Sequence, residues 1–534
     1  MKKKSGFCLG VSGSLWINIL FQLQEKHEVD FSFISGGTDV LEHNAFKHIL
    51  SIENLTLYRG GMPEGLKVNP FKVDETILSK YREEELICLE MSDRMDQGYS
   101  FSRPERERLY IQSLNLWLSA IELLQPEFII MPDTPHSVVE YVLYAVAKKS
   151  GIKVLMFSQV PAIERVLAYS DYKNISANIK LEYEKLKITK QDVLLSEDLV
   201  SYVEKYQQGY SAVMPKYLKK RLQKSSTMSN FEKLQKFSSD VFRFKRYAGA
   251  LNDRIVLLRN KFNSATVALF NDKAPGNYLK MPYQALESTD GLDAKQWRCY
   301  KNKAQSYKEM LLQEYKKYSS SFGNLKEKYI YVPLHYQPER TTCPEGGRYS
   351  NQILLIRVIA SCLPENWKVV VKENPSQLLP KTLHGERARY PYYYEDISTI
   401  PNVKLINMNT DPFALIKNCE AVATITGTTG WEALLNGKPV LCFGYAWYQG
   451  CEGVFNISDL ESCQSAINSL LKGIVVPNEK VLTFLYALDK HSFKGFLNLK
   501  RYEDPEHGEQ QNYQHMLPLI RNFIQTGEIV FTKV

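Results

Sequence analysis

Short apolar runs alternate with helix-favouring stretches over the first third of the chain. The runs predicted as strands are residues 7–11, 29–35, 128–132 and 153–158, and the predicted helices begin near Leu15 and span 137–151. A helix that lies between short buried strands is typical of a parallel sheet with right-handed crossovers. We therefore predict a Rossmann-like half over residues 1–175.

The same alternation resumes after residue 325. Predicted strands are 329–334, 368–373, 403–406, 421–426 and 439–444, and predicted helices are 352–363, 411–419 and 431–437. Asp411 and Pro412 should begin the second of these helices, because Asp is a favourable N-cap and Pro a favourable first residue. We predict a second Rossmann-like half over residues 326–490 and a helical tail over 491–534. The predicted fold class is therefore α/β.

Residues 176–325, between the two halves, are polar and helix-favouring, and they carry no strand signal. Within them, residues 216–261 hold thirteen Lys or Arg against three acidic residues, whereas the whole chain carries a net charge of +8. This basic segment (residues 216–261) is either a solvated helical face or a surface for anionic lipid or a lipid-linked acidic glycan. We predict no nucleic-acid partner, because no recognition motif accompanies the charge.

Composition narrows the class of protein. A length of 534 residues exceeds what one hydrophobic core supports, and 44% apolar with 24% charged residues is typical of a globular protein. No apolar run reaches the roughly 18 residues of a membrane span. The nine cysteines are scattered without a CxxC pair, which argues against a disulfide scaffold and against a zinc site. We expect a cytoplasmic protein whose amino terminus is a strand, a Gly/Ser turn and a helix rather than a signal peptide.

The clearest candidate for ligand binding is the glycine–threonine turn in ITGTTGWEALLNGKPVLCFG (425–444). A strand precedes the turn and a helix follows it, so backbone N–H groups and the helix dipole favour an anion there. Gly427 allows close approach, the Thr428 and Thr429 hydroxyls can donate to phosphate, and Glu432 can accept from ribose hydroxyls. The alternative is that these residues only cap a helix. Open α/β sheets bind ligands at this edge, which favours the functional interpretation.

A second candidate is the end of the strand in KVVVKENPSQ (368–377). This strand delivers Lys372, Glu373, Asn374 and Pro375 to its carboxyl edge. The lysine can neutralise a phosphate, and the rigid Asn-Pro turn can present backbone groups to a base or a sugar. The alternative is that these residues have no ligand and that Pro375 only ends the strand.

A third candidate is the polar loop in VPLHYQPERTTCPEGG (332–347). Arg340 suits phosphate or carboxylate recognition through its planar guanidinium. His335 or Glu339 can transfer protons. A lone histidine at the end of a strand is more often structural, but the density of polar groups is unusual for a connecting loop.

The first half contributes Asp133 and His136, just past the predicted strand 128–132. A carboxylate and an imidazole three residues apart can serve as a base and its orienter, or can bind the hydroxyls of a sugar. The alternative is that Asp133 caps the turn or the next helix and that His136 lies near the start of that helix. The turn at residues 12–14 is predicted at the same edge.

Three motifs in order, YVPLHYQPERTT, VVVKENP and TITGTTGWEALLNGKPVLCFG, resemble the capsular polysaccharide biosynthesis glycosyltransferases of bacteria. That family includes enzymes that add Kdo to capsule linkers. The resemblance implies a GT-B-like fold, in which two Rossmann-like domains face a cleft, here with a helical insertion. Relatives commonly carry Lys-Glu-His-Pro where this chain has Asn374 in place of the histidine. The His-Pro element recurs in enzymes that use CMP-activated acidic sugars; asparagine can hydrogen-bond a phosphate but cannot act as a cation or a general acid.

The resemblance implies a glycosyltransferase that moves a sugar onto a glycan or glycolipid acceptor of a surface or capsular polysaccharide. Kdo or another acidic sugar from a CMP donor is one candidate for that sugar. Lys372, Arg340 and the threonines would stabilise the leaving nucleotide. Asp133 with His136 is our first choice of base and Glu339 our second. We expect no metal and no cofactor besides the nucleotide sugar, and a peripheral place on the inner membrane. A nucleotide-sugar epimerase and a non-catalytic capsule-assembly scaffold remain as alternatives.

Overall fold

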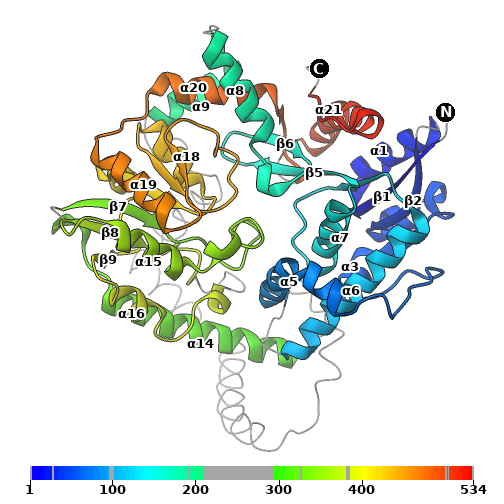
Figure 1. Ribbon diagram of the computed structural model, residues 1–534, viewed down its shortest axis with the longest axis horizontal. Coiled ribbons are helices and arrows are strands. Elements are labelled where there is room, and N and C mark those ends of the chain that lie inside the picture. The colour runs from blue at the N-terminus through cyan, green and yellow to red at the C-terminus, as the bar shows by residue number, and fades with distance from the viewer. Residues whose placement is uncertain are drawn as a thin grey trace, which may run out of the picture. The chain divides into compact units, whose positions relative to one another are not determined.

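The computed structural model of the protein describes residues 3–26, 29–95, 102–189, 193–207, 294–324, 327–379, 385–499, 502 and 504–531 (Figure 1). The chain divides into two compact units, Met1–Leu199 with Lys280–Val534, and Val200–Leu279. Of the second unit, the structure describes the end of helix α9 (Glu197–Gln207). The basic segment lies outside the described residues, so its two interpretations both remain predictions.

The amino-terminal half is built on a seven-stranded sheet with the order β13-β6-β5-β4-β1-β2-β3. Its strands are β1 (Lys4–Val11), β2 (Val29–Gly36), β3 (Leu50–Glu53), β4 (Phe128–Met131), β5 (Lys153–Val160), β6 (Arg165–Tyr169) and β13 (Phe493–Lys494). Strands β5, β4, β1, β2 and β3 are parallel to one another, whereas β6 runs antiparallel to β5 and to β13. The four strands predicted for this half are all present.

Helices cover both faces of this first sheet because its strands are apolar on both faces. On one face Trp117 of α6 packs edge-on against Phe33 of β2, and its indole N–H donates to the Val139 carbonyl of α7 at 2.7 Å. On the other face α1 and α21 share one core with β1, β2, β4 and β5. The helices of this half are α1 (Gly13–Glu25), α2 (Thr38–Leu41), α3 (Asn54–Tyr58), α4 (Glu75–Lys80), α5 (Arg82–Met95), α6 (Arg103–Leu124), α7 (Val138–Lys149) and α8 (Ala177–Thr189).

The carboxyl-terminal half is built on a six-stranded, all-parallel sheet with the order β12-β11-β10-β7-β8-β9. Its strands are β7 (Lys328–Pro333), β8 (Trp367–Lys372), β9 (Val403–Leu405), β10 (Ala421–Thr424), β11 (Val440–Cys442) and β12 (Val454–Asn456). Its helices are α14 (Ala294–Tyr318), α15 (Gln352–Cys362), α16 (Tyr393–Ser398), α17 (Pro412–Asn418), α18 (Thr428–Leu435), α19 (Leu460–Leu471) and α20 (Asn478–Lys490). The two parallel-rich sheets confirm the predicted α/β class.

Local signals placed most helix ends correctly, with one exception at α18. Asp411 caps α17, accepting from the Phe413 N–H at 3.1 Å, as its side chain predicts. The helix expected at 431–437 instead begins at Thr428, and the strand before it ends at Thr424. Gly427 is the extended N-cap residue, with ψ of 148°, so both threonines lie in the first helical turn.

The tail predicted as helical at 491–534 also returns to the first sheet. Strand β13 pairs with β6, and helix α21 (Pro505–Thr526) packs beside α1 (Figure 1). The Lys4 ammonium donates to the Ile524 carbonyl at 2.7 Å, so the first strand and the last helix are joined. None of the described helices has the length and apolar character that crossing a membrane requires.

Candidate functional site

Sheet order brings all three predicted segments of the second half to one edge of the sheet. Strand β7 lies between β8 and β10, so the residues that follow these three parallel strands share one edge. Pro333 at the end of β7 pairs with Lys372 at the end of β8. The His335 Nε2 lies 2.8 Å from the Thr424 hydroxyl at the end of β10. The polar loop after β7 therefore separates Lys372 from the glycine–threonine turn.

The turn after β10 leads directly into the first turn of α18. Thr428 is exposed and Thr429 is half-buried, at the end of the helix where backbone N–H groups are unpaired. Gly427 is required by packing, since a Cβ there would lie 2.8 Å from the Thr424 hydroxyl and 3.2 Å from the His335 ring. Close packing alone is therefore enough to explain why residue 427 is glycine. The side chains of this turn that can contact a ligand are those of the two threonines.

Lys372 is the unusual group at this edge. Its side chain is buried, 7% exposed, and burial lowers the pKa of its ammonium to about 8. Asp411 and Glu373 oppose that shift. Neither carboxylate forms an ion pair with Lys372 among the described residues, because Asp411 caps α17 and Glu373 is held by Arg389. A buried ammonium without a carboxylate partner is costly unless an anion completes the site.

His335 has a structural role in the strand-end network. The Ile425 backbone N–H donates to its Nε2 at 3.2 Å, which makes that nitrogen an acceptor. Burial and the nearby Arg389 lower its pKa to about 4. The imidazole is therefore neutral at physiological pH, so a general-acid role for His335 would require an unfavourable protonation.

Glu373 and Asn374 are engaged by their own neighbours. The Glu373 carboxylate is fully buried and accepts from Arg389 Nε at 2.8 Å and from the Tyr394 hydroxyl at 2.7 Å. Asn374 accepts from the Ser376 N–H at 2.9 Å, which closes the turn around the exposed Pro375. A ligand contact by Glu373 would have to displace these bonds, and Arg389 is a partner that the sequence did not indicate.

Arg340 links the two halves instead of standing at the edge beside Lys372. Its guanidinium forms an ion pair with Asp133 and lies 3.3 Å from the buried Glu345 carboxylate. Burial lowers the pKa of Arg340, but Glu345 and Asp133 outweigh burial and the net direction is upward. Thr134 joins the cluster, because its hydroxyl donates to Glu345 at 3.1 Å. Sequence reasoning missed Glu345 and Thr134, although both belong to the loops it selected, CPEGG and PDTPH.

The candidate bases lie in different surroundings. The Asp133 side chain is 43% exposed, and its Oδ1 also accepts from the Thr134 N–H at 2.8 Å. The His136 Nδ1 lies 2.8 Å from the Thr134 carbonyl, and Ser137 rather than Asp133 caps α7. Glu339 is exposed and accepts from the Thr341 hydroxyl at 3.2 Å. Asp133 therefore combines solvent access with a fixed orientation.

Glu432 does not extend freely from its helix. It lies on α18, and burial raises the pKa of its carboxyl to about 7. Its charge raises the pKa of the buried Tyr331 and Tyr448 hydroxyls, which places it near both rings. A contact with ribose hydroxyls therefore stays a prediction for a carboxyl that is partly protonated at neutral pH.

Residues 290–468 match the family model described as "Capsule polysaccharide biosynthesis protein". This segment is about a third of the chain, and over it the chain is similar to that family. The segment contains all three motifs on which the resemblance was based, together with the sheet edge described above. The family resemblance drawn from the sequence is confirmed.

Two relatives are both named "Capsule polysaccharide modification protein LipA", from Neisseria meningitidis serogroup B and serogroup A. Each is 27% identical over 155 residues, which is 28% of this chain and 20% of the relative. The match therefore spans about a fifth of the length of these relatives. Their activity does not transfer to this chain on that basis alone.

The solved structures that match most of the chain do so at low similarity. The β-Kdo 2,7 transferase KpsC of Thermosulfurimonas dismutans is 10% identical with a TM-score of 0.31, covering 96% of this chain and 99% of that chain. UDP-GlcNAc 2-epimerase from Methanocaldococcus jannaschii is 10% identical with a TM-score of 0.23, covering 91% and 99%. Likeness at this level does not choose between a transferase and an epimerase.

Proposed function

We propose that the protein is a glycosyltransferase of capsule polysaccharide assembly that binds the anionic part of a nucleotide sugar at the carboxyl edge of its second sheet. One observation carries the proposal: the Lys372 ammonium is buried, yet it has no carboxylate partner among the described residues. The family match over residues 290–468 supports the class of pathway. A phosphate would supply the negative charge that pairs with the Lys372 ammonium.

The leaving nucleotide gains negative charge as the glycosidic bond to phosphate breaks. Lys372 and the Thr428 and Thr429 hydroxyls would stabilise that charge, because preorganised donors act most strongly away from bulk water. Arg340 leaves this set, since it is held by Asp133 and Glu345. The proposed nucleotide site therefore consists of one lysine and one helix terminus, whereas the sequence predicted two cations, Lys372 and Arg340.

The acceptor hydroxyl needs a base, and Asp133 is the residue we propose. The acceptor oxygen forms a bond to the anomeric carbon, the bond from that carbon to the phosphate oxygen breaks, and the acceptor proton passes to Asp133. Arg340 holds the carboxylate in place through one oxygen, Oδ1. A base within reach of the acceptor contributes about 10²–10⁴-fold to such a step.

Nucleotide binding tests the proposal directly. Isothermal titration of the purified protein with CMP, UDP, GDP and dTDP should give binding to at least one of them, and the preferred nucleotide identifies the donor class. CMP would favour Kdo or another acidic sugar. Binding of none of the four would contradict the proposal and favour the scaffold alternative. Product analysis with and without a glycan acceptor then separates transfer from epimerisation.

A further inference from the structure

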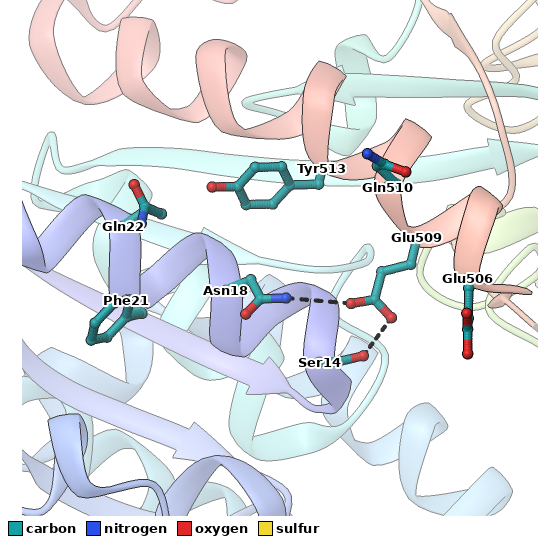
Figure 2. Close-up of a pocket in the computed structure, with 8 residues that line it drawn as sticks. All are labelled: Ser14, Asn18, Phe21, Gln22, Glu506, Glu509, Gln510 and Tyr513. Carbon is teal, nitrogen blue, oxygen red and sulfur yellow. Dashed lines mark hydrogen bonds between the residues drawn. The ribbon is translucent and has the colours of Figure 1, made fainter.

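A polar groove between α1 and α21 lies outside the site described above. It has a volume of about 540 Å³, within the range of small-molecule sites (Figure 2). Both walls are helical and come from opposite ends of the chain. The lining residues are Ser14, Asn18, Phe21 and Gln22 of α1, and Glu506, Glu509, Gln510 and Tyr513 of α21.

The lining has a consistent chemistry. Six of the eight side chains are hydroxyls, amides or carboxylates, two are aromatic, and no lysine, arginine or histidine is among them. Planar amides and carboxylates each present two polar atoms side by side, a spacing that suits neighbouring hydroxyls. Aromatic rings offer an apolar surface for the C–H face of a sugar ring. The groove therefore combines the two kinds of contact that a saccharide requires.

Charge decides which saccharide can bind. Glu506 and Glu509 face the groove without a cation among its lining residues, so a phosphate or an acidic sugar would meet like charge. The charge of the groove is opposite to that of the edge of the second sheet, where the Lys372 ammonium is proposed to bind an anion. The groove and the donor site therefore select different parts of the reactants.

The hydrogen bonds that now cross the groove can be exchanged for bonds to hydroxyls. Ser14 donates to one oxygen of Glu509, and the Asn18 amide lies 3.5 Å from the other, at the long limit of a hydrogen bond (Figure 2). Both side chains of α1 are exposed. A sugar hydroxyl donates and accepts at once, so it can insert between the amide and the carboxylate without leaving either unsatisfied.

The groove begins at the edge of the first sheet where an acceptor is expected. Helix α1 starts directly after β1, so Ser14 lies at the carboxyl end of that strand, while Phe21 lies further along the helix. The Tyr513 ring lies between the two helices (Figure 2). A chain of sugars could thus extend from the sheet edge outward along α1.

We propose that the α1–α21 groove binds an uncharged saccharide segment of the glycan acceptor. That this saccharide belongs to the acceptor rests on the proposed function, whereas the binding of a neutral saccharide in the groove does not depend on it. Gln510 and Tyr513 supply an amide and an aromatic surface from α21, and Asn18 and Gln22 supply amides from α1.

The test uses the full chain and saturation-transfer NMR with chitotriose and lactose as neutral probes and oligosialic acid as an acidic probe. We expect a neutral probe to bind and the acidic probe to bind at least tenfold more weakly. Gln510→Lys should reduce neutral-probe affinity about tenfold by closing the groove and pairing with its carboxylates. Gln514→Lys is the matched control, since Gln514 is an exposed α21 residue outside the lining, and it should leave binding unchanged.

Two results would overturn the inference: neither neutral probe binds, or binding is the same in Gln510→Lys and wild type. Both glutamines are exposed, so both variants should fold, and thermal melts verify this. Nucleotide titration of the same variants separates the two proposals. Groove-dependent saccharide binding without any nucleotide binding would retain this inference and reject the proposed function; the converse would do the opposite.

Discussion

The Arg340 guanidinium, in the loop after β7, forms an ion pair with the Asp133 carboxylate, in the loop after β4. The pair joins the strand ends of the two sheets, and the buried Glu345 lies on the other side of the arginine at 3.3 Å. Arg340 thus holds the proposed base while satisfying a carboxylate in the interior. Its removal should affect stability as well as catalysis.

Arg340→Met should lower the free energy of unfolding by about 3–5 kcal/mol, because it leaves Glu345 buried without its cation. Denaturant titration measures the loss. Glu345→Gln in the same chain should restore part of it, since the unpaired charge is then gone. A double variant no more stable than Arg340→Met would show that Glu345 does not depend on the arginine.

Asp133→Asn should reduce kcat for glycosyl transfer by about 10²–10⁴-fold with little change in nucleotide affinity, because the amide keeps the shape of the carboxylate but cannot accept the proton. Glu339→Gln is the control, since Glu339 is exposed and was the second candidate base. Initial rates with a saturating donor give the comparison. An active Asp133→Asn beside an inactive Glu339→Gln would reverse the assignment.

Lys372→Met should weaken nucleotide binding by at least tenfold and stabilise the free protein by about 1–3 kcal/mol, because it removes a buried charge that has no carboxylate partner in the described part of the chain. Lys368→Met is the matched control on the same strand. The two lysines are four positions apart on the strand, so they share a face but lie about 13 Å apart. Titration calorimetry and thermal melts measure both effects; equal affinity in the two variants would remove Lys372 from the donor site.

Nucleotide affinity should fall as the pH rises through about 8, because Lys372 then loses its proton. The pKa of Lys372 in the folded protein lies below its usual value of 10.5. The unfolded chain therefore holds more protons between pH 8 and 10.5, and stability rises with pH over that window. Binding and stability should therefore move in opposite directions. If the nucleotide affinity of the Lys372→Met variant declines as steeply above pH 8 as that of the wild type, the titrating group is not Lys372.

Acidification should destabilise the protein through His335. Burial lowers its folded pKa from 6.5 to about 4, so the unfolded chain binds a proton first and stability is lost as pH falls through this window. At pH 5 the loss from this group is about 2 kcal/mol relative to pH 7. Denaturant titrations of wild type and His335→Gln at both pH values measure it. An identical pH effect in the variant would contradict the assignment.

Binding to vesicles tests the lipid interpretation of residues 216–261. If this basic segment rests on anionic lipid, cosedimentation should increase with phosphatidylserine content and fall with salt, since each cation near such a surface contributes about 1 kcal/mol. Reversing the charge of Lys219, Lys220 and Arg221 should weaken it. If cosedimentation changes with neither lipid charge nor salt, the lipid interpretation is wrong and the interpretation as a solvated helical face remains.

The sequence by itself determined much of the alternation of strands and helices, because the signals involved are local, but it missed β3, β6, β12 and β13. Apolar runs such as 128–132 are short enough to be strands only, and Asp411 caps a helix with its own side chain. The boundary at Thr428 was the error, because threonine and glycine have weak helix propensity and the fold places them in the first turn. The three motifs were also sufficient to recognise the family.

Only the tertiary structure decided what each polar side chain meets. The sequence placed Arg340 and His335 among the residues that bind the nucleotide sugar and offered His335 or Glu339 for proton transfer. The fold pairs the arginine with Asp133 and makes the histidine a neutral acceptor. It also brought α21 onto α1, which created the groove. The physical reason is that helix and strand periodicity depends on neighbours a few residues away, whereas charge, burial and pairing depend on residues hundreds of positions apart that sheet order brings together.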